Sequence, residues 1–160
     1  MGLKAILWTL PVLVVAIVIA GLCGASLWQT GTPELAHGQL MRFLAEAAWY
    51  PTALLPSQGV LWEGIDDTSA RASLTDGSAA ASLEFPFDGA GLIRTVRSSG
   101  RYRLLYGEQV PTPWQGRFWR YELREGMPVP LEGEVEWLLP EGPKAYWRGR
   151  IRRMEYEYAR

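Results

Sequence analysis

Cysteine and histidine are nearly absent from this chain of 160 residues, which contains only Cys23 and His37 of these two types. A single cysteine excludes an intramolecular disulfide and any zinc or redox site built on cysteines. A metal site would need oxygen ligands, and Asp66, Asp67 and Asp76 have the spacing of ordinary turns. We therefore expect no metal and no cofactor, and we expect His37 to be exposed on the polar side of a helix.

Catalytic motifs are missing as well. The sequence has no Gly-x-Ser-x-Gly motif, no phosphate-binding loop and no dinucleotide fingerprint. Spacing does not single out a glycosidase-like pair among the 17 acidic residues. The formal net charge of -1 argues against nucleic acid as a partner, because nucleic-acid binding usually needs a basic surface. These absences favour a binding or structural role over an enzyme, and we assign no catalytic residue.

Charge is absent from one long stretch of the chain, between Lys4 and Glu34. The apolar residues 5–28 inside it are long enough as a helix to cross a bilayer core of about 30 Å. Lys4 precedes the segment, and Trp8 and Trp28 lie near its two ends. The positive-inside rule then predicts a single-pass membrane protein, with its N-terminus in the cytoplasm and the following domain extracytoplasmic.

Two alternatives for the same segment stay open. Small residues at positions 24–26 would suit a signal peptidase, so residues 1–28 are either a transmembrane anchor or a signal peptide. Residues 20–23 resemble a lipoprotein signal that would acylate Cys23, although Leu22 stands where a small residue is expected. After this segment we predict a linker at 29–32 and one domain at 33–160, a length that can bury a core.

One soluble helix is predicted at the start of the domain. Thr32 is a suitable N-cap, Pro33 suits the first helical position, and Glu34 complements the helix dipole. Arg42 and Glu46 form an i,i+4 pair that we expect to be partly buried. An apolar stripe at helical spacing is formed by Ala36, Leu40, Phe43, Leu44 and Ala47.

Pro51 is expected to end this helix. The segment 51–56 is too apolar for a solvated loop and is bounded by prolines, so we expect an ordered turn buried under a sheet.

Beyond residue 60 the apolar period changes to two, which predicts about seven strands. They are expected at 60–65, 70–75, 80–87, 92–97, 115–124, 131–139 and 146–158. Turn sequences at 76–77, 88–91, 125–126 and 141–143 separate them. The predicted fold is therefore α+β, with one amphipathic helix packed on a curled antiparallel sheet that forms an open half-barrel with two edges.

Two details of the last strands are predicted from side-chain parity. In 131–139, three glutamates alternate with Leu131, Val135 and Trp137, so their face is expected to be wet. In 146–158, Trp147 and Ile151 share one parity whereas Met154, Tyr156 and Tyr158 share the other, which predicts a β-bulge at Arg152–Arg153.

Several segments resemble a bacterial protein family of unknown function. They are RFLAEAAWYPTALLP at 42–56, WEGIDD at 62–67, RYR at 101–103, PW at 113–114 and GEVEW at 133–137. The resemblance covers roughly residues 32–158 and implies an apolar N-terminal segment and a curled antiparallel sheet similar to the lipoprotein-carrier half-barrels. It also implies the bacterial cytoplasmic membrane as the location of the predicted anchor, and it implies no reaction.

This chain departs from the family's length, because its apolar segment leads almost directly into the helix. It resembles the C-terminal half of the family's domain joined to an anchor. We therefore expect an unpaired sheet edge and an incompletely covered concave face, which would pair with a second copy, with a protein partner or with membrane lipid.

Aromatic residues are abundant, with 8 Trp, 7 Tyr and 4 Phe. Core packing explains many of them, and the alternative is an apolar surface for a lipid-like ligand with arginines as head-group contacts. The ligand-binding candidates are Arg42, Glu46, Trp49, Trp62, Arg101, Arg103 and Trp114. We expect a membrane-anchored domain that binds such a ligand; the alternatives are a tethered protein-interaction module without a ligand and, with least support, an envelope hydrolase.

Overall fold

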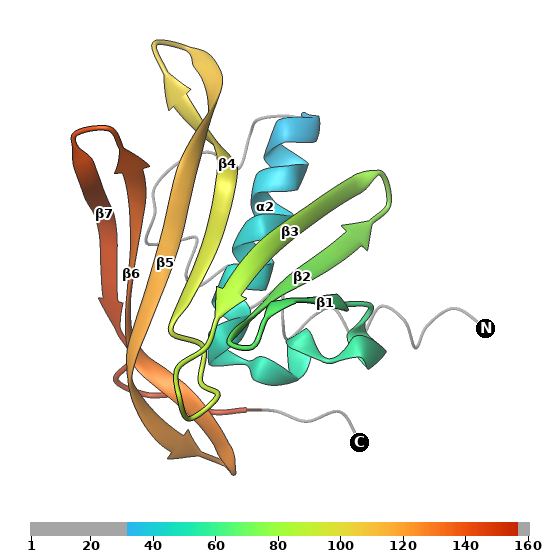
Figure 1. The fold of residues 1–160 in the computed structure, drawn as a ribbon, viewed down its shortest axis with the longest axis vertical. Helices are drawn as coiled ribbons and strands as arrows, with labels where there is room; N and C mark the ends of the chain where they lie inside the picture. Colours follow the sequence, from blue (N-terminus) through green and yellow to red (C-terminus); the bar gives the residue numbers. More distant parts are fainter. Residues whose placement is uncertain (1–31, 157–160) are drawn as a thin grey trace. The chain divides into compact units, whose positions relative to one another are not determined.

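The computed structural model describes residues 32–156. In this part of the chain the fold is α+β, with one α-helix, three short 3-10 helices and a seven-stranded antiparallel sheet (Figure 1). The strands follow one another in sequence order, β1-β2-β3-β4-β5-β6-β7, and the sheet does not close into a barrel. The predicted α+β class and the open antiparallel sheet are therefore confirmed.

The elements all belong to one unit, which spans Gly31–Arg153. The helical elements are α2 (Pro33–Glu46), η1 (Ala47–Trp49), η2 (Pro51–Leu54) and η3 (Pro56–Gln58). The strands are β1 (Leu61–Asp66), β2 (Ser69–Asp76), β3 (Ala79–Pro86), β4 (Thr95–Leu105), β5 (Glu108–Arg124), β6 (Met127–Leu139) and β7 (Gly142–Arg150).

The predicted anchor at 1–28 and Tyr158 lie outside the described residues. Within residues 32–156, no helix has the length and apolar character needed to cross a membrane.

Helix α2 starts as predicted, but its buried face is rotated from the predicted stripe. Thr32 Oγ1 accepts a hydrogen bond from Leu35 N at 3.3 Å, and Pro33 occupies the first turn. The buried residues of α2 are Met41, Leu44 and Ala45, whereas Ala36 is exposed. Leu44 and Ala47 of the predicted stripe are buried, but Leu40 and Phe43 are only half-buried, and Met41 and Ala45 are buried in addition.

The proline-bounded segment is ordered but mostly not buried. It forms η2 and the start of η3, in which Leu54 is 7% exposed whereas Leu55 is 49% exposed. Short 3-10 turns fit between Pro51 and Pro56 because a proline suits the first helical position. The expected ordered turn is therefore present, but its burial was predicted wrongly for Thr52, Leu55 and Pro56, which are exposed.

The sheet contains one hairpin that strand periodicity did not predict. Strand β4 runs on to Leu105 and β5 begins at Glu108, so the strand expected at 92–97 is only the start of a long hairpin arm. Its turn is Tyr106-Gly107, with φ of 52° and 90°. A tyrosine in the left-handed region is an unusual turn residue, which explains why the turn is hard to see in the sequence.

The bulge expected at Arg152–Arg153 was predicted at the wrong place. Strand β7 ends at Arg150, and its register on β6 shifts at Tyr146, because Val135 pairs with Trp147 and Glu136 pairs with Ala145. The extra residue lets Tyr146 and Trp147 both contact tryptophans, Trp137 and Trp49 respectively.

Glycines let these tryptophans lie close to the sheet. Gly133 and Gly149 are direct partners on β6 and β7. A Cβ at Gly149 would come within 2.4 Å of the Trp147 ring, and a Cβ at Gly133 would lie 3.2 Å from Trp49. The small residues therefore provide the space that the rings fill.

The opposite face of the sheet carries a row of polar residues in direct register. Glu63 pairs with Arg71, Arg71 with Glu84, and Glu84 with Arg97. The row continues through Gln115 to Glu136. Salt bridges join Arg71 to Glu63 at 3.6 Å and to Glu84 at 3.1 Å.

The glutamate face of β6 was expected to be wet, and this expectation was wrong. Glu134 is 6% exposed and Glu136 is 3% exposed. Arginine and glutamine side chains from the neighbouring strands cover both carboxylates, a feature that the alternation within a single strand does not reveal.

Candidate functional site

A bulge in β4 turns two arginines toward the helix side of the sheet. Ser98 pairs with Trp114, but the next registered pair is Arg101 with Thr112, so β4 holds one extra residue between them. Gly100 N donates to Ser98 Oγ at 3.2 Å within the bulge. Because a bulge reverses side-chain parity, Arg101 and Arg103 come to share a face with Trp114.

Each of these arginines lies over a tryptophan of the next strands. The Arg101 guanidinium is 5.1 Å from the Trp114 ring, and that of Arg103 is 5.7 Å from the Trp137 ring. Trp114 and Trp137 are direct partners on β5 and β6. Tyr146 joins them, since its Oη accepts from Trp114 Nε1 at 2.8 Å and its ring stacks on Trp137 at 5.3 Å.

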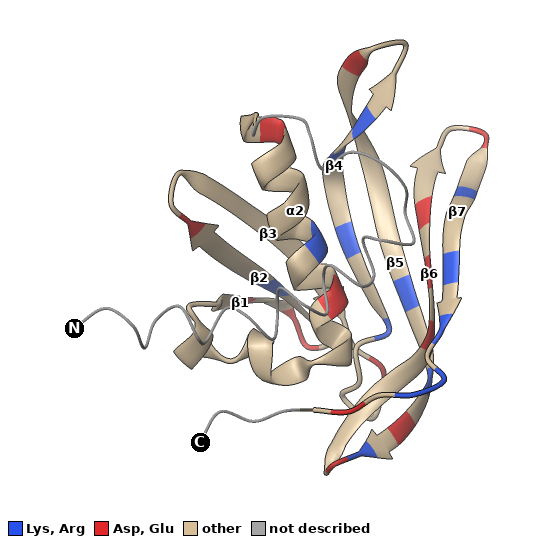
Figure 2. Ribbon diagram, turned by 180° about the vertical axis from the view of Figure 1, so that it is seen from behind, with Lys and Arg blue, Asp and Glu red and all other residues tan. Residues whose placement is uncertain are grey.

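Helix α2 contributes a partly buried ion pair to the same region. Arg42 Nε and Glu46 Oε1 are 2.6 Å apart, with side-chain exposures of 28% and 15%. The predicted partial burial of this pair is confirmed. Both charges lie close enough to act on the Arg101 guanidinium. We define the arginine–tryptophan cluster as Arg42, Glu46, Arg101, Arg103, Trp114, Trp137 and Tyr146; Figure 2 views the domain from the helix side, with basic positions in blue.

Arg101 is the least satisfied group of the cluster. Its Nη1 atom is buried and has no hydrogen-bond partner among the described residues. Burial lowers the pKa of Arg101 and Arg42 lowers it further, whereas Tyr146 and Glu46 oppose the shift. The guanidinium still stays charged at neutral pH, because its ordinary pKa is far above that range. Three arginines and one glutamate leave this cluster with an excess of positive charge.

The seven predicted ligand-binding residues divide between this cluster and two aromatic groups outside it. Arg42, Glu46, Arg101, Arg103 and Trp114 belong to the cluster. Trp49 instead packs on Phe118 and Trp147, and Trp62 packs on Phe85 and Phe87 and donates to Leu54 O at 2.8 Å.

Trp137 and Tyr146 were missed as members of the cluster. The GEVEW segment around Trp137 could have indicated one of them. Tyr146 could not be found by periodicity, because it sits in the bulge of β7.

A second polar network lies on the opposite face. Glu134 accepts hydrogen bonds from Arg117 and pairs with Arg148 Nε at 2.7 Å. Gln115 donates to Glu136, which also pairs with Arg117 at 3.3 Å. Burial raises the pKa of Glu134, but the hydrogen bond from Arg117 and the charges of Arg148 and Arg117 outweigh burial, so the pKa lies below its ordinary value.

This network predicts a specific pH dependence of stability. Because the pKa of Glu134 is lowered on folding, its ionised form stabilises the fold above the unfolded-state pKa of about 4.3, and this contribution is lost as the pH falls through the folded pKa. Glu134→Gln should therefore lower the free energy of unfolding at pH 7, and its difference from the natural chain should shrink below pH ~4. Urea unfolding at several pH values measures this. An equal difference at pH 7 and pH ~3 would contradict the expectation; Glu63→Gln, whose side chain is 74% exposed, is the control.

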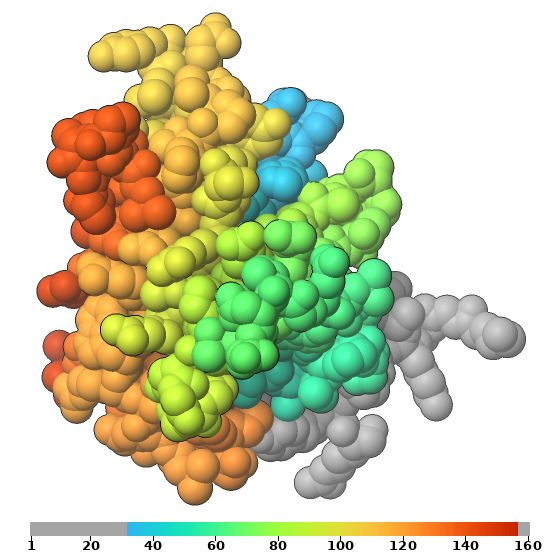
Figure 3. Space-filling view, viewed as in Figure 1, coloured from blue at the N-terminus to red at the C-terminus, as the bar shows by residue number. Residues whose placement is uncertain are grey.

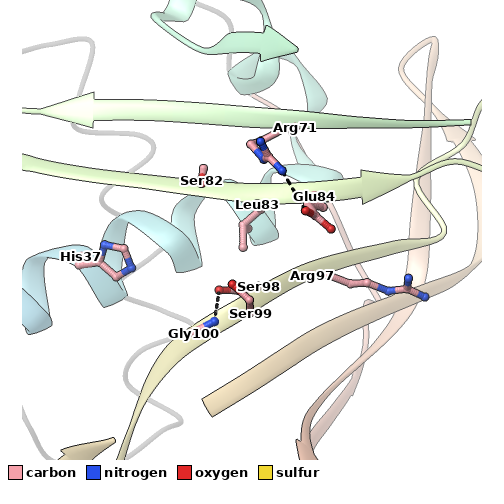
Figure 4. A pocket seen from close by; sticks show the side chains of 9 residues that line it. All are labelled: His37, Arg71, Ser82, Leu83, Glu84, Arg97, Ser98, Ser99 and Gly100. Carbon is pink, nitrogen blue, oxygen red and sulfur yellow. Dashed lines mark hydrogen bonds and ion pairs between the residues drawn. The ribbon is translucent and has the colours of Figure 1, made fainter. Parts of the chain in front are cut away.

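A pocket of about 380 Å3 opens where β3 and β4 separate (Figure 4). Its lining includes His37, Arg71, Ser82, Glu84 and Ser98. His37 was expected to be exposed, but it is half-buried, with Nδ1 2.8 Å from Ala80 O. Arg71 is paired with Glu84. Within the described residues His37 lies in hydrogen-bond contact with a backbone carbonyl, and the Ser98 hydroxyl accepts a hydrogen bond from Gly100 N.

Metal ligation has no support in the described part of the chain. Residues 32–156 contain no group of three or more histidine, cysteine or acidic residues that could hold an ion. Asp66 forms the predicted turn, in which its Oδ1 accepts from Thr68 N at 2.8 Å. That backbone hydrogen bond is the largest cause that lowers the pKa of Asp66, and a side-chain hydrogen bond with Ser69 is the next.

Comparison with known proteins finds a family but no characterised relative. A protein-family model described as "Family of unknown function (DUF6920)" matches residues 17–156. The match includes the whole described helix and sheet. No curated protein and no solved structure matches the chain. The site therefore has to be interpreted from its own geometry.

Proposed function

We propose that this chain, which belongs to the DUF6920 family of unknown function, is a membrane-tethered extracytoplasmic domain of a bacterial envelope that binds an amphiphilic ligand with an anionic head group. The arginine–tryptophan cluster is the proposed site.

Arg101 is the observation that carries this proposal. A buried guanidinium nitrogen without a hydrogen-bond partner is costly, and an anionic oxygen would relieve that cost. Arg42 and Arg103 add positive charge, and Glu46 is already engaged by Arg42. The head group of the ligand would lie against these arginines, because planar guanidinium groups bind carboxylate and phosphate oxygens well.

The aromatic side chains support an apolar part of the same ligand. Trp137 is half-buried and Tyr146 is 50% exposed, so both present ring surface beside the arginines. Ligand sites commonly combine aromatic walls with a few polar groups that orient the ligand. An amphiphile satisfies both halves of this surface, whereas a small inorganic anion would use only the arginines.

Binding of lysophosphatidylglycerol tests the proposal, with zwitterionic lysophosphatidylcholine as the reference probe. The full chain in a non-ionic detergent should bind the anionic probe in preference, measured by tryptophan fluorescence and native mass spectrometry. A charge-assisted hydrogen bond contributes about 1.5 to 3 kcal/mol, so Arg101→Met should weaken binding on the order of tenfold or more.

Matched variants separate loss of the site from loss of one charge. Arg97→Met removes an exposed arginine from the other face of the same strand and should leave affinity unchanged. Arg101→Lys should retain part of the affinity because it keeps the charge. Equal weakening by Arg101→Met and Arg97→Met, or no saturable binding by the natural chain, would contradict the proposal.

The tether and its orientation are tested separately. Residues 5–28 and the single preceding charge, Lys4, support an N-terminus in the cytoplasm. A phosphatase reporter fused after Arg160 should therefore be active in the periplasm of a bacterial host. Activity of a cytoplasm-only reporter at the same junction would overturn this orientation.

A protein-interaction module is the second candidate function. Every residue of the edge strand β1 is exposed, including Leu61 at 73% and Ile65 at 44%. An unpaired, partly apolar edge of this kind can add a strand from a partner or from a second copy. Self-association of the full chain together with a lipid-free mass would favour this candidate over ligand binding.

A further inference from the structure

The β4–β5 hairpin extends alone beyond the rest of the sheet. β3 pairs with β4 at Glu84–Arg97, and the registered pairs of β5 with β6 begin at Trp114–Trp137. Residues 101–112 are therefore paired only within the hairpin, as a two-stranded arm. Figures 1 and 3 show its tip projecting from the body of the domain. A two-stranded ribbon is only marginally stable by itself, so a contact outside the ribbon would stabilise an arm of this length.

Three exposed apolar side chains lie at the tip of this arm, beside the exposed Glu108 and Gln109. Leu104 is 64% exposed, Val110 is 38% exposed, and Tyr106 is 105% exposed. The other long hairpin turn, between β5 and β6, carries charged Glu125 at the corresponding position. Leu104 pairs with Gln109 and Val110 pairs with Arg103, so Leu104 and Val110 lie on opposite faces of the ribbon. Exposed apolar side chains on a projecting tip indicate a contact outside the domain.

Tyr106 is also in an unfavourable backbone conformation. Its φ of 52° and the 90° of Gly107 are those of a type I′ turn, in which asparagine, aspartate or glycine is usual at the first position. The ring gains nothing within the domain that would offset this cost, because it is fully exposed. Glu125 takes the same conformation in the β5–β6 turn, with φ of 48°, so the feature particular to this tip is the exposed aromatic ring.

The arm starts from the end of the domain where the chain enters it. The His37 ring, in the first turns of α2, contacts Tyr102 of the arm at 5.9 Å. Tyr106 lies about 13 Å further along the strand. Residues 29–32 separate the apolar segment from Pro33, and four residues span at most about 14 Å. A membrane surface that held residues 5–28 would therefore lie within reach of the hairpin tip.

We propose that the tip formed by Leu104, Tyr106 and Val110 inserts into the interfacial layer of the bilayer that carries the anchor. The inference rests on the proposed tether. Tyrosine suits this layer, because its ring is apolar and its hydroxyl stays in contact with water and head groups. Insertion fixes the domain at the surface by two points, the anchor and the arm, and holds the adjacent Arg101 and Arg103 at the level of lipid head groups.

Site-specific fluorescence of the full chain in vesicles tests this arrangement. In a Cys23→Ser background, a cysteine replaces either Leu104 or Leu123 and carries an environment-sensitive dye. Leu123 is the matched control for Leu104, since the two side chains are 69% and 64% exposed. Leu104 lies near the β4–β5 turn, whereas Leu123 lies near the β5–β6 turn. The vesicles contain phosphatidylcholine and doxyl-labelled phosphatidylcholine. The dye at 104 should shift to the blue and be quenched by the doxyl lipid, and the dye at 123 should show neither effect.

Three results would overturn the inference. They are no quenching at 104, equal quenching at both positions, and unchanged quenching at 104 after Tyr106→Asn, which keeps the turn but removes the ring. Flotation of the same samples separates this inference from the tether. A chain that floats with the vesicles without quenching at 104 contradicts the hairpin contact alone, whereas a chain that does not float contradicts the tether as well.

Discussion

Replacement of Phe85 by alanine is expected to lower the free energy of unfolding by about 3 to 5 kcal/mol. Phe85 is 0% exposed on β3 and is among the largest fully buried side chains. Its ring packs edge-on against Trp62 at 5.2 Å. Removing it leaves a cavity beside the Trp62 ring, because the surrounding core relaxes only partially.

Urea unfolding of the full chain in a non-ionic detergent, followed by tryptophan fluorescence, measures this loss. Leu61→Ala is the matched control, because Leu61 is 73% exposed on the edge strand β1 and should change stability by less than about 0.5 kcal/mol. A loss below about 1 kcal/mol for Phe85→Ala would mean that the core does not depend on this ring.

The sequence predicts the local structure wherever one residue type enforces it. Thr32, Pro33 and Glu34 predict the start of α2, and glycines at 77, 126 and 142 mark turns that the structure contains. Alternation predicts the open meander because each strand needs only its own residues for that pattern. The predictions that failed concern geometry set by residues on neighbouring helices and strands. The face of α2 and the burial of Glu134 are set by residues on other elements.

The candidate site is predictable in composition but not in arrangement. Arg42, Glu46, Arg101, Arg103 and Trp114 meet as a group although they come from α2, β4 and β5. The bulge before Arg101 decides this, because it reverses the parity that a period of two would give. A second bulge, at Tyr146, interrupts the parity of β7. No residue type marks a bulge reliably, so the side of the sheet on which each arginine lies becomes clear only from the register.

Trp49→Ala is expected to be as damaging as Phe85→Ala, at about 3 to 5 kcal/mol, because the structure makes this residue part of the core. Trp49 is 9% exposed and contacts Phe118 at 5.6 Å and Trp147 at 6.0 Å, both edge-on. It links η1 to the far strands of the sheet, above the space left by Gly133.

A milder substitution of the same residue distinguishes a role of Trp49 in the core from a role in ligand binding. Trp49→Phe keeps an aromatic ring and should retain most of the stability, and it should leave affinity for lysophosphatidylglycerol unchanged, since Trp49 does not belong to the arginine–tryptophan cluster. Urea unfolding and the lipid titration on the same variant give the two readings. Weakened lipid binding by Trp49→Phe at unchanged stability would move Trp49 from the core to the ligand surface, and it would require a binding site that extends past Tyr146 toward Trp147.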